Sequence, residues 1–419
     1  MVRSITNAYR AAYSGLSREI WVLSAALFVN RCGSMVLAFM TLYLTNKLGF
    51  SMFEAGGIFS IYGLGSLTGA YLGGRLVKPL GAIRTQIVGL TFSAPILVTV
   101  PLFESWWSVA LVVFLFSVCT ESVRPANSVA VAQFAPADLH TRAFGLQRMA
   151  VNLGFSIGPA IGGVLATYNY SLLFIVDAIT TVLGALILLW HFGFRKYAKC
   201  KTAAAQQKLA EQNQSRESPL SDYFFLAFLL LTVLVGTVFL QFHATYPKYL
   251  EEHYLLTKPM IGLLYSVNTI LIVIVEMLLL QWVRRFALLK TIGWGGFLVC
   301  IGFGILPFGN TFLFAILSMS IITFGAMFLF PLGMSFVARR SIGRDQGMYI
   351  SWYAMMFSMS ALIAPLIGTL TYQLNPHLFW HVTLPVSLVL LAGHYALHKR
   401  SHQDSLGMAA PQATVSHPS

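Results

Sequence analysis

Charged residues are scarce in this chain. Asp, Glu, Lys and Arg together make up 10% of its 419 residues, whereas a soluble domain averages about 25%. Only 14 residues are acidic, against 27 that are basic. So few charges cannot solvate the surface of a globular protein of this length, and 57% of the residues are hydrophobic. The composition therefore excludes an ordinary soluble protein and favours one that lies in a lipid bilayer.

Cysteine and catalytic motifs are also scarce. The four cysteines, Cys32, Cys119, Cys200 and Cys300, match no metal-binding spacing and are expected to be inert thiols. The chain has no HExxH, no GxSxG and no glycine-rich phosphate loop with a lysine. We therefore expect no enzyme activity, no cofactor and no metal. A non-transporting receptor is disfavoured too, because no sizeable extramembrane domain is evident.

What the chain does contain is a series of apolar blocks of about 20 residues, the length that crosses a bilayer core as a helix. We predict an all-α polytopic membrane protein with twelve transmembrane helices. The blocks cover residues 21–45, 55–77, 84–103, 107–132, 144–167, 170–192, 223–247, 260–283, 288–308, 311–337, 347–373 and 378–397.

The basic residues report the orientation of these helices. With both termini cytoplasmic, nearly all Lys and Arg outside the helices fall on the cytoplasmic side, and only Lys47, Lys248 and Lys258 lie on the other. This is a positive-inside bias. It explains the net charge of +13 without a nucleic-acid partner. We expect a multi-pass protein of a bacterial inner membrane.

The longest internal polar stretch separates six blocks from six. We therefore expect a first six-helix bundle at 1–192, a cytoplasmic linker at 193–222, a second bundle at 223–398 and a cytoplasmic tail at 399–419. Because six is even, both bundles enter the membrane in the same orientation, which makes a parallel repeat. One offset of 206 residues aligns them: Tyr43 with Tyr249, Gly56 with Gly262, Pro125 with Pro331, Pro159 with Pro365 and Gly162 with Gly368.

This organisation resembles the major facilitator superfamily over residues 20–398. The fifth block carries GFSIGPAIGG, with Gly154, Gly158, Pro159, Gly162 and Gly163, and is similar to the fifth-helix signature of drug–proton antiporters. The resemblance implies alternating access between two bundles, with helices 1, 4, 7 and 10 around a central cavity and helix 5 where the bundles meet. We expect a monomer.

The glycines of that block recur every four residues. Gly154, Gly158 and Gly162 form a stripe without side chains, which allows two membrane helices to approach closely. Pro159 bends the helix. Tight packing and a moving gate are equally good interpretations of this stripe, and Pro365 and Gly368 are its expected counterparts in the second half.

One loop departs from the family pattern. Between the second and third blocks the chain reads GRLVKPLGAIR, from Gly74 to Arg84. Lys78 stands where the family has an acid, and Pro79 where it has an arginine. A latch on the cytoplasmic side that depends on that acid cannot form here by the same charge.

Charges within the apolar blocks need a reason, because each costs at least about 2.5–3.5 kcal/mol at the bilayer centre. In the fourth block Ser117, Glu121 and Arg124 share one face, and Glu121 and Arg124 can pair. The family fold would bring Asn30 and Arg31 of the first block to the same place. A static ion-pair cluster and a substrate or proton site are both open interpretations.

Glu276 in the eighth block has no basic neighbour in sequence before Arg284. An isolated carboxyl in an apolar helix is typical of a proton carrier. The alternative is a structural carboxyl that is hydrogen-bonded to a neighbour such as Asn268. Gln241 and His243 in the seventh block add a polar wall suited to a substrate. Asp177 in the sixth is read as structural.

Three functions remain. Proton-coupled export of small amphipathic molecules is favoured by the fifth-helix signature and by the Met- and aromatic-rich tenth and eleventh blocks. Proton-coupled import of a small nutrient or anionic metabolite would use the same fold, and Arg31 with Arg124 suits an anion. A non-transporting receptor is the third. We expect the partners to be a small-molecule substrate, protons and the bilayer, with Glu276 and Glu121 as candidates for proton coupling.

Overall fold

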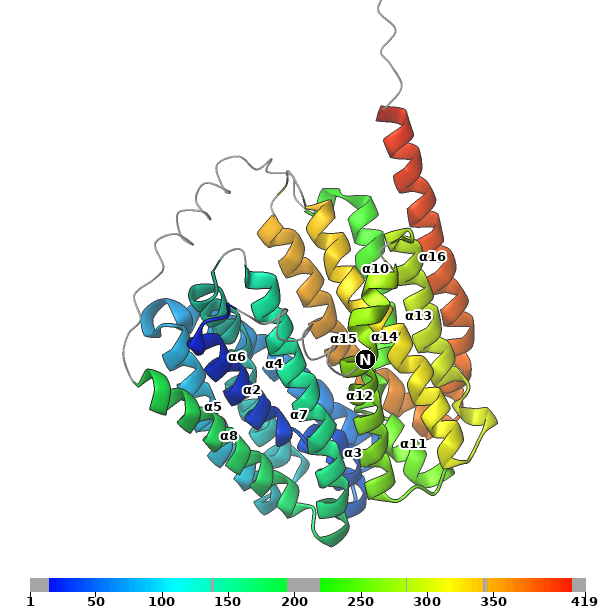
Figure 1. Cartoon of the computed structure of the whole chain (residues 1–419). Helices are drawn as coiled ribbons and strands as arrows, with labels where there is room; N and C mark the ends of the chain where they lie inside the picture. The colour runs from blue at the N-terminus through cyan, green and yellow to red at the C-terminus, as the bar shows by residue number, and fades with distance from the viewer. Residues whose placement is uncertain are drawn as a thin grey trace, which may run out of the picture.

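The computed structural model describes residues 15–136, 139–193, 219–283, 285–341, 344 and 346–408. Most of the expected linker and the end of the expected tail lie outside these residues. The regular elements of the described part are helices, and Figure 1 shows α2 to α8 grouped beside α10 to α16.

The first group contains the helices expected from the first six apolar blocks. They are α2 (Arg18–Cys32), α3 (Val36–Leu42) with the π-helical turn η1 (Tyr43–Lys47), α4 (Met52–Leu80), α5 (Ala82–Thr99) with η2 (Val100–Leu102), α6 (Trp106–Phe134), α7 (His140–Tyr168) and α8 (Ser171–Phe192).

The second group follows the short turn η4 (Pro219–Ser221). It contains α10 (Tyr223–Phe239) with η5 (Leu240–Phe242), α11 (Tyr246–His253), α12 (Lys258–Val283), α13 (Leu288–Gly304) with η6 (Leu306–Phe308), α14 (Phe312–Arg340), α15 (Gln346–Leu374) and α16 (Leu378–Met408). The last helix is longer than the expected apolar block at 378–397. The last helix continues to Met408, past the expected start of the tail at residue 399, because no proline or glycine interrupts the sequence there before Gly407.

Within the described residues, eleven helical segments are long and apolar enough to cross a membrane. Helix α4 is not among them although it has 29 residues, because glycines and polar residues dilute its apolar character. It packs between α6 and α15 like the other long helices, and it completes the twelve spans of two six-helix bundles.

The internal repeat is visible in the element boundaries. Helices α6 and α14 begin and end 206 residues apart, and so do α7 and α15. The two bundles are therefore built on one backbone plan in the same orientation, as the sequence offset predicts.

We name the two ends of the bundles by their turns. The linker face is the end where α8 stops at Phe192 and α10 starts at Tyr223. The far face is the opposite end, with the turns at residues 48–51 and 254–257.

Two transmembrane helices are interrupted at equivalent positions: helix 1, which consists of α2 and α3, and helix 7, which consists of α10 and α11. Residues 33–35 form a turn between α2 and α3, and residues 240–245 form a 3-10 turn and a further turn between α10 and α11. Gly33 is required at the first break because a Cβ there would lie 1.7 Å from the Thr180 hydroxyl of α8. Interrupted helices at matching places in two repeats mark the binding region of many transporters.

The two bundles meet through α7 with α12 and through α4 with α15. A Cβ on Gly262 would lie 2.2 Å from the Pro159 carbonyl oxygen. At the equivalent crossing, a Cβ on Gly56 would lie 2.9 Å from the Pro365 carbonyl oxygen. The glycine and proline pairs aligned in the sequence are therefore the two symmetric crossings between the bundles.

The glycine stripe of α7 faces its own bundle instead. Added Cβ atoms would lie 2.5 Å from the Arg31 Cβ at Gly154, 2.9 Å from the Cys32 carbonyl oxygen at Gly158 and 2.6 Å from the Met35 Cβ at Gly162. The stripe therefore packs against the break of helix 1, between α2 and α3. Gly163 points the other way, where a Cβ would lie 2.4 Å from the Lys258 carbonyl oxygen of the second bundle.

Candidate functional site

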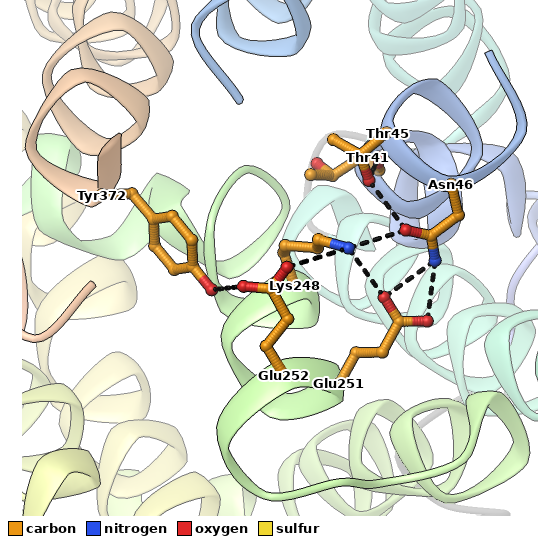
Figure 2. Close-up of polar contacts among 7 residues, drawn as sticks. All are labelled: Thr41, Thr45, Asn46, Lys248, Glu251, Glu252 and Tyr372. Atoms are coloured by element: carbon orange, nitrogen blue, oxygen red, sulfur yellow. Dashed lines mark hydrogen bonds and ion pairs between the residues drawn. The ribbon is translucent and has the colours of Figure 1, made fainter. Parts of the chain in front are cut away.

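The far face is closed by a polar network between the bundles, drawn in Figure 2. The Lys248 ammonium of α11 donates to the Asn46 amide oxygen of η1 at 2.7 Å and lies 3.1 Å from both Glu251 and Glu252. The Asn46 amide group donates in turn to the Glu251 carboxylate at 2.8 Å. The Tyr372 hydroxyl donates to Glu252. We call Asn46, Lys248, Glu251 and Glu252 the far-face latch.

Two further bonds join the bundles near the latch. The Thr41 hydroxyl of α3 donates to the Ala244 carbonyl oxygen at 2.6 Å. Ala244 lies in the break of helix 7, between η5 and α11. The Lys258 ammonium donates to the Ala166 carbonyl oxygen of α7 at 3.0 Å. The far face is therefore sealed by hydrogen bonds as well as by glycine packing.

A cavity of about 550 Å³ lies between the bundles. Its charged and polar lining comes mainly from the first bundle. The lining side chains that the argument below uses are Asn30, Arg31, Tyr62, Glu121, Arg124 and Arg148.

A second compartment of about 280 Å³ adjoins the first, and the two share Arg148, Phe155 and His243. This aromatic compartment is lined from the second bundle by Phe239, Phe242, Tyr265, Met327 and Phe330. Helices 1 (α2 and α3), 4 (α6), 7 (α10) and 10 (α14) all line the combined space, as the family fold implies. Helices 2 (α4), 5 (α7), 8 (α12) and 11 (α15) also contribute.

The cavity is accessible from the linker face. The Arg124 side chain is 69% exposed and that of Arg148 is 46% exposed, and both side chains line the cavity. Since the far-face latch closes the other end, the structure is a state in which the cavity opens toward the linker.

Glu121 and Arg124 pair as their spacing predicts. Their side chains lie 3.0 Å apart, and the Tyr62 hydroxyl donates to Glu121 at 3.3 Å. Arg31 lies in the same cavity, with its guanidinium 5.5 Å from the centre of the Phe155 ring. Within the described residues its buried Nε has no hydrogen-bond partner.

The prediction that Glu276 is isolated was wrong. Its carboxylate forms an ion pair with Arg148 of α7, so this pair joins the two bundles inside the cavity. Asn268, the alternative partner, instead donates to Thr323 at 2.7 Å. Sequence distance misled the prediction, because α7 and α12 lie side by side only in the folded protein.

Two other residues do not lie where they were expected. Ser117 is fully buried and donates to the Tyr62 carbonyl oxygen at 2.7 Å, so it packs α6 against α4. Gln241 is fully buried and donates to the Ala364 carbonyl oxygen at 2.5 Å, and a Cβ on Gly368 would lie 1.9 Å from the Gln241 oxygen. Both side chains are used for helix packing and line neither compartment.

Asn30 and His243 do lie in the cavity wall. Asn30 donates to the Thr181 hydroxyl at 3.0 Å. His243 sits at the break of helix 7, stacked on Tyr265, and its buried Nδ1 has no hydrogen-bond partner in the described part of the chain. Asp177 packs against the helix 1 break, where it accepts hydrogen bonds from the Val36 N–H and the Thr181 hydroxyl.

A separate ion cluster lies at the linker face of the second bundle. Asp222 caps α10 by accepting from the Phe225 N–H at 3.1 Å, and it accepts from Arg340 at 2.8 and 2.9 Å. Arg344 and Tyr349 also donate to it. Burial alone would raise the pKa of Asp222, but these bonds lower it to about 2. The sequence analysis missed this cluster because its members come from three separate elements.

Across the described residues, no three His, Cys, Asp or Glu side chains come together as a metal-binding group. The cavity instead offers paired charges, the Arg31 and His243 side chains and an aromatic wall. Such a set can bind and release a small molecule.

The sequence model of the Major Facilitator Superfamily, a protein family, matches residues 23–341 and 228–410 of the chain. The chain belongs to this superfamily. It is therefore a transporter of small molecules across a membrane and not an enzyme.

Several curated relatives cover most of the chain. The uncharacterized MFS-type transporter YttB of Bacillus subtilis (strain 168) is 25% identical over 361 residues, 84% of this chain and 88% of the relative. Multidrug resistance protein 1 of the same organism is 21% identical over 88% of this chain and 94% of its own. Quinolone resistance protein NorA of Staphylococcus aureus (strain COL) is 20% identical over 89% and 95%.

Solved structures agree on the fold. A POT family transporter in complex with 5-aminolevulinic acid has a TM-score of 0.75 at 16% identity, covering 92% of this chain and 98% of its own. The nucleoside transporter NupG has a TM-score of 0.74 at 14% identity, covering 91% and 100%. At these identities the likeness concerns the fold alone.

Proposed function

We propose that this transporter exports small amphipathic molecules in exchange for protons by alternating access. Two units would move against each other, residues 1–192 and residues 223–398, connected by the linker 193–222, with the residues after 398 as a tail. The observation that carries the proposal is the Arg148–Glu276 ion pair, which joins the two bundles inside the cavity.

The ion pair provides a place where a proton changes the contact between the bundles. A proton that binds the Glu276 carboxylate forms an O–H bond and cancels its charge, which ends the charge attraction to Arg148. The α7–α12 contact then loses its ionic tie. Release of that proton restores the pair, so proton binding and bundle separation are linked.

Glu121 is the second proton-coupling candidate. Its pairing with Arg124 stays within one helix, so protonation of Glu121 would change the charge of the cavity without releasing a contact between bundles. We therefore assign the main coupling role to Glu276 and a role in substrate handling to Glu121, Arg124, Arg31 and Asn30.

Export is supported by the relatives and by the lining. Several relatives carry the names of multidrug or quinolone resistance proteins. Aromatic and Met side chains such as Phe330 and Met327 make an adaptable apolar wall that suits varied amphipathic molecules. We propose a bacterial inner membrane as the location and a monomer as the working form.

The linker face would be cytoplasmic, with both termini on that side. The concentration of basic residues there supports this orientation. Ser215 lies in the linker, outside the described residues, and a Ser215→Cys variant in a cysteine-free background tests the proposal. An impermeant thiol reagent should fail to label it in intact cells and should label it after lysis. Ready labelling in intact cells would reverse the orientation.

Transport direction is measured in vesicles of both orientations. Inside-out vesicles with an acidic lumen should accumulate a fluorescent amphipathic dye, and a protonophore should abolish the accumulation. A Glu276→Gln variant present at equal amount is the matched control. Accumulation only in right-side-out vesicles under an inward proton gradient would contradict export and favour uptake.

Uptake is the second candidate function. Three arginines line the larger compartment, which suits an anionic metabolite as well as an exported compound. In uptake the proton and the substrate would travel together, so a substrate gradient alone should acidify the vesicle lumen. Export predicts the opposite direction of proton movement.

A further inference from the structure

Three arginines line the larger compartment, and two of them form ion pairs with a carboxylate. Its charged lining consists of Arg31, Glu121, Arg124 and Arg148. Arg124 pairs with Glu121 and Arg148 pairs with Glu276. Among the described residues, Arg31 is the lining cation for which no ion pair within 4 Å is found.

Glu121 and Asp177 act electrostatically on Arg31, but among the described residues neither lies within ion-pair distance of it, and each has other partners. Glu121 accepts from Tyr62 and faces Arg124. Asp177, on the other side of Arg31, is held by the Val36 N–H and the Thr181 hydroxyl at the helix 1 break. Neither carboxylate satisfies the buried Arg31 Nε.

A second polar atom in the same wall also lacks a partner. The Nδ1 of His243 is buried without a hydrogen bond within the described residues, and His243 lines both compartments. Buried polar groups are hydrogen-bonded in nearly all proteins, and a group that is not requires an explanation. Both side chains line the larger compartment, and within the described residues neither forms a hydrogen bond. A ligand in the compartment can therefore supply partners to both.

The chemistry of the missing partner follows from the donor. A guanidinium donates in a planar fork that matches a carboxylate or sulfonate and has no acceptor of its own. An anionic group beside Arg31 would accept from the guanidinium and form the ion pair that Arg31 lacks within the described residues. The rest of the molecule would then reach past Phe155 into the aromatic compartment.

We propose that the substrates are amphipathic anions, bound with the anionic group on Arg31 and the aromatic body between Phe155, Tyr265 and Phe330. His243, at the junction of the two compartments, supplies a hydrogen bond to a polar atom between the two ends. This inference rests on the proposed transport of amphipathic molecules and names their charge.

A matched pair of probes tests the charge preference without any mutation. 2-Naphthaleneacetic acid and 2-naphthaleneacetamide share a ring and nearly the same shape, but only the first is anionic at pH 7.5. Binding is measured by calorimetry on the full chain in phosphatidylcholine nanodiscs, with empty nanodiscs subtracted. The acid should bind at least about tenfold more tightly than the amide. Equal affinities, or tighter amide binding, would overturn the proposal.

Variants then assign the preference to Arg31. Arg31→Gln should reduce the ratio of acid to amide affinity to about one while leaving amide binding within about threefold, and retained amide binding shows that the cavity is folded. Arg31→Lys should keep part of the preference. Arg75→Gln is the matched control, because Arg75 is exposed on α4 and lines neither compartment. An undiminished ratio in Arg31→Gln would overturn the role of Arg31.

The same probes separate this inference from the proposed function. If the acid is preferred in binding but neither probe moves in vesicles under a proton gradient, export fails and the anion site stands. If a neutral or cationic dye is exported while the acid shows no preference in binding, export stands and the anion site fails.

Discussion

The two bundles share a backbone plan but differ in the residues that face the cavity. The first bundle presents charges at positions where the second presents uncharged, mostly apolar side chains. The pairs related by the 206-residue offset are Glu121 with Met327, Arg124 with Phe330 and Arg31 with Thr237, and Thr237 lines neither compartment. The repeat therefore explains the architecture, whereas the substrate chemistry comes from the divergence between its copies.

The contacts between the bundles have diverged in the same way. Arg148 and Glu276 tie α7 to α12, but the equivalent positions on α15 and α4 are Ala354 and Ala70. The glycine crossings are symmetric and the ionic tie is not. In the proposed mechanism, a proton would therefore act on one of the two crossings alone.

The symmetric crossings should give the largest effects. Gly56→Leu and Gly262→Leu each place a side chain against the opposite bundle, within 3 Å of backbone. Overpacking costs about 1–3 kcal/mol, which shifts a two-state equilibrium by about five- to 150-fold. Transport should fall by at least about tenfold in both, with increased thiol labelling of an Ala166→Cys reporter, because Ala166 is buried while the far face is closed.

Gly158→Leu is the control for crowding inside one bundle, because Gly158 faces Cys32 of the same bundle. It should lower the melting temperature and transport together. Loss of transport in only one of the two crossing variants would break the symmetry argument.

The asymmetric tie should give the next largest effect. Glu276→Gln removes the titrating group and the ion pair, so the transport rate should fall about tenfold and lose its dependence on an imposed pH gradient. Glu121→Gln should lower apparent substrate affinity and keep that dependence. Transport and pH dependence are measured in vesicles, with Glu104→Gln outside the cavity as control. A normal pH response in Glu276→Gln would rule out Glu276 as the proton carrier.

The aromatic wall should give a smaller and less selective effect. Phe330→Ala removes apolar contact from the second bundle, so it should weaken 2-naphthaleneacetic acid and its amide alike, by about fivefold. Arg31→Gln should weaken only the acid. Calorimetry on both probes separates the two walls, and a Phe330→Ala variant that affects the acid alone would contradict the division of roles.

The far-face latch should give a modest effect. Asn46→Ala removes hydrogen bonds to Lys248 and Glu251, which are each worth about 0.5–1.5 kcal/mol. The population that is open at the far face should rise about two- to fivefold, read as faster labelling of a Tyr372→Cys reporter. Lys47→Ala is the neighbouring control, because Lys47 is exposed and lies outside the latch, and equal labelling in both variants would exclude a latch at Asn46.

The linker-face cluster should give the smallest pH effect. Because the pKa of Asp222 is lowered to about 2, below the unfolded value of about 3.9, its stabilisation is present above pH 4 and is lost as pH falls toward 2. The difference in melting temperature between the wild type and Asp222→Asn should be constant from pH 8 to 5 and shrink near pH 3. A difference that changes between pH 8 and 5 would contradict this assignment.

The sequence predicted the fold well because its main determinants are local. Helix length follows from the apolar runs, and the pairs Gly56 with Gly262 and Pro159 with Pro365 revealed the repeat. Part of the site was also accessible, because Glu121 and Arg124 lie on the same helix and their spacing predicts their contact.

The rest of the site depends on contacts between helices that have no signature in one sequence. Arg148 and Glu276 are distant in the chain, and no residue near Glu276 in the sequence indicates that Arg148 is its partner. Ser117 and Gln241 are of the residue types that line cavities, but their positions around the helix axis direct their side chains toward α4 and α15. The break at residues 33–35 carried only Gly33 as a signal.

The two helix breaks have a consequence for the speed of opening. Helices α3 and α11 are separated from α2 and α10 by turns, so their far-face ends are short levers that can swing without unwinding a long helix. The barrier to far-face opening is then set by a few bonds, chiefly Thr41 to the Ala244 carbonyl. Amide hydrogen exchange in α11 should accordingly be faster than in α10. The far face should open and close locally while the bundles remain in contact through α7 and α12.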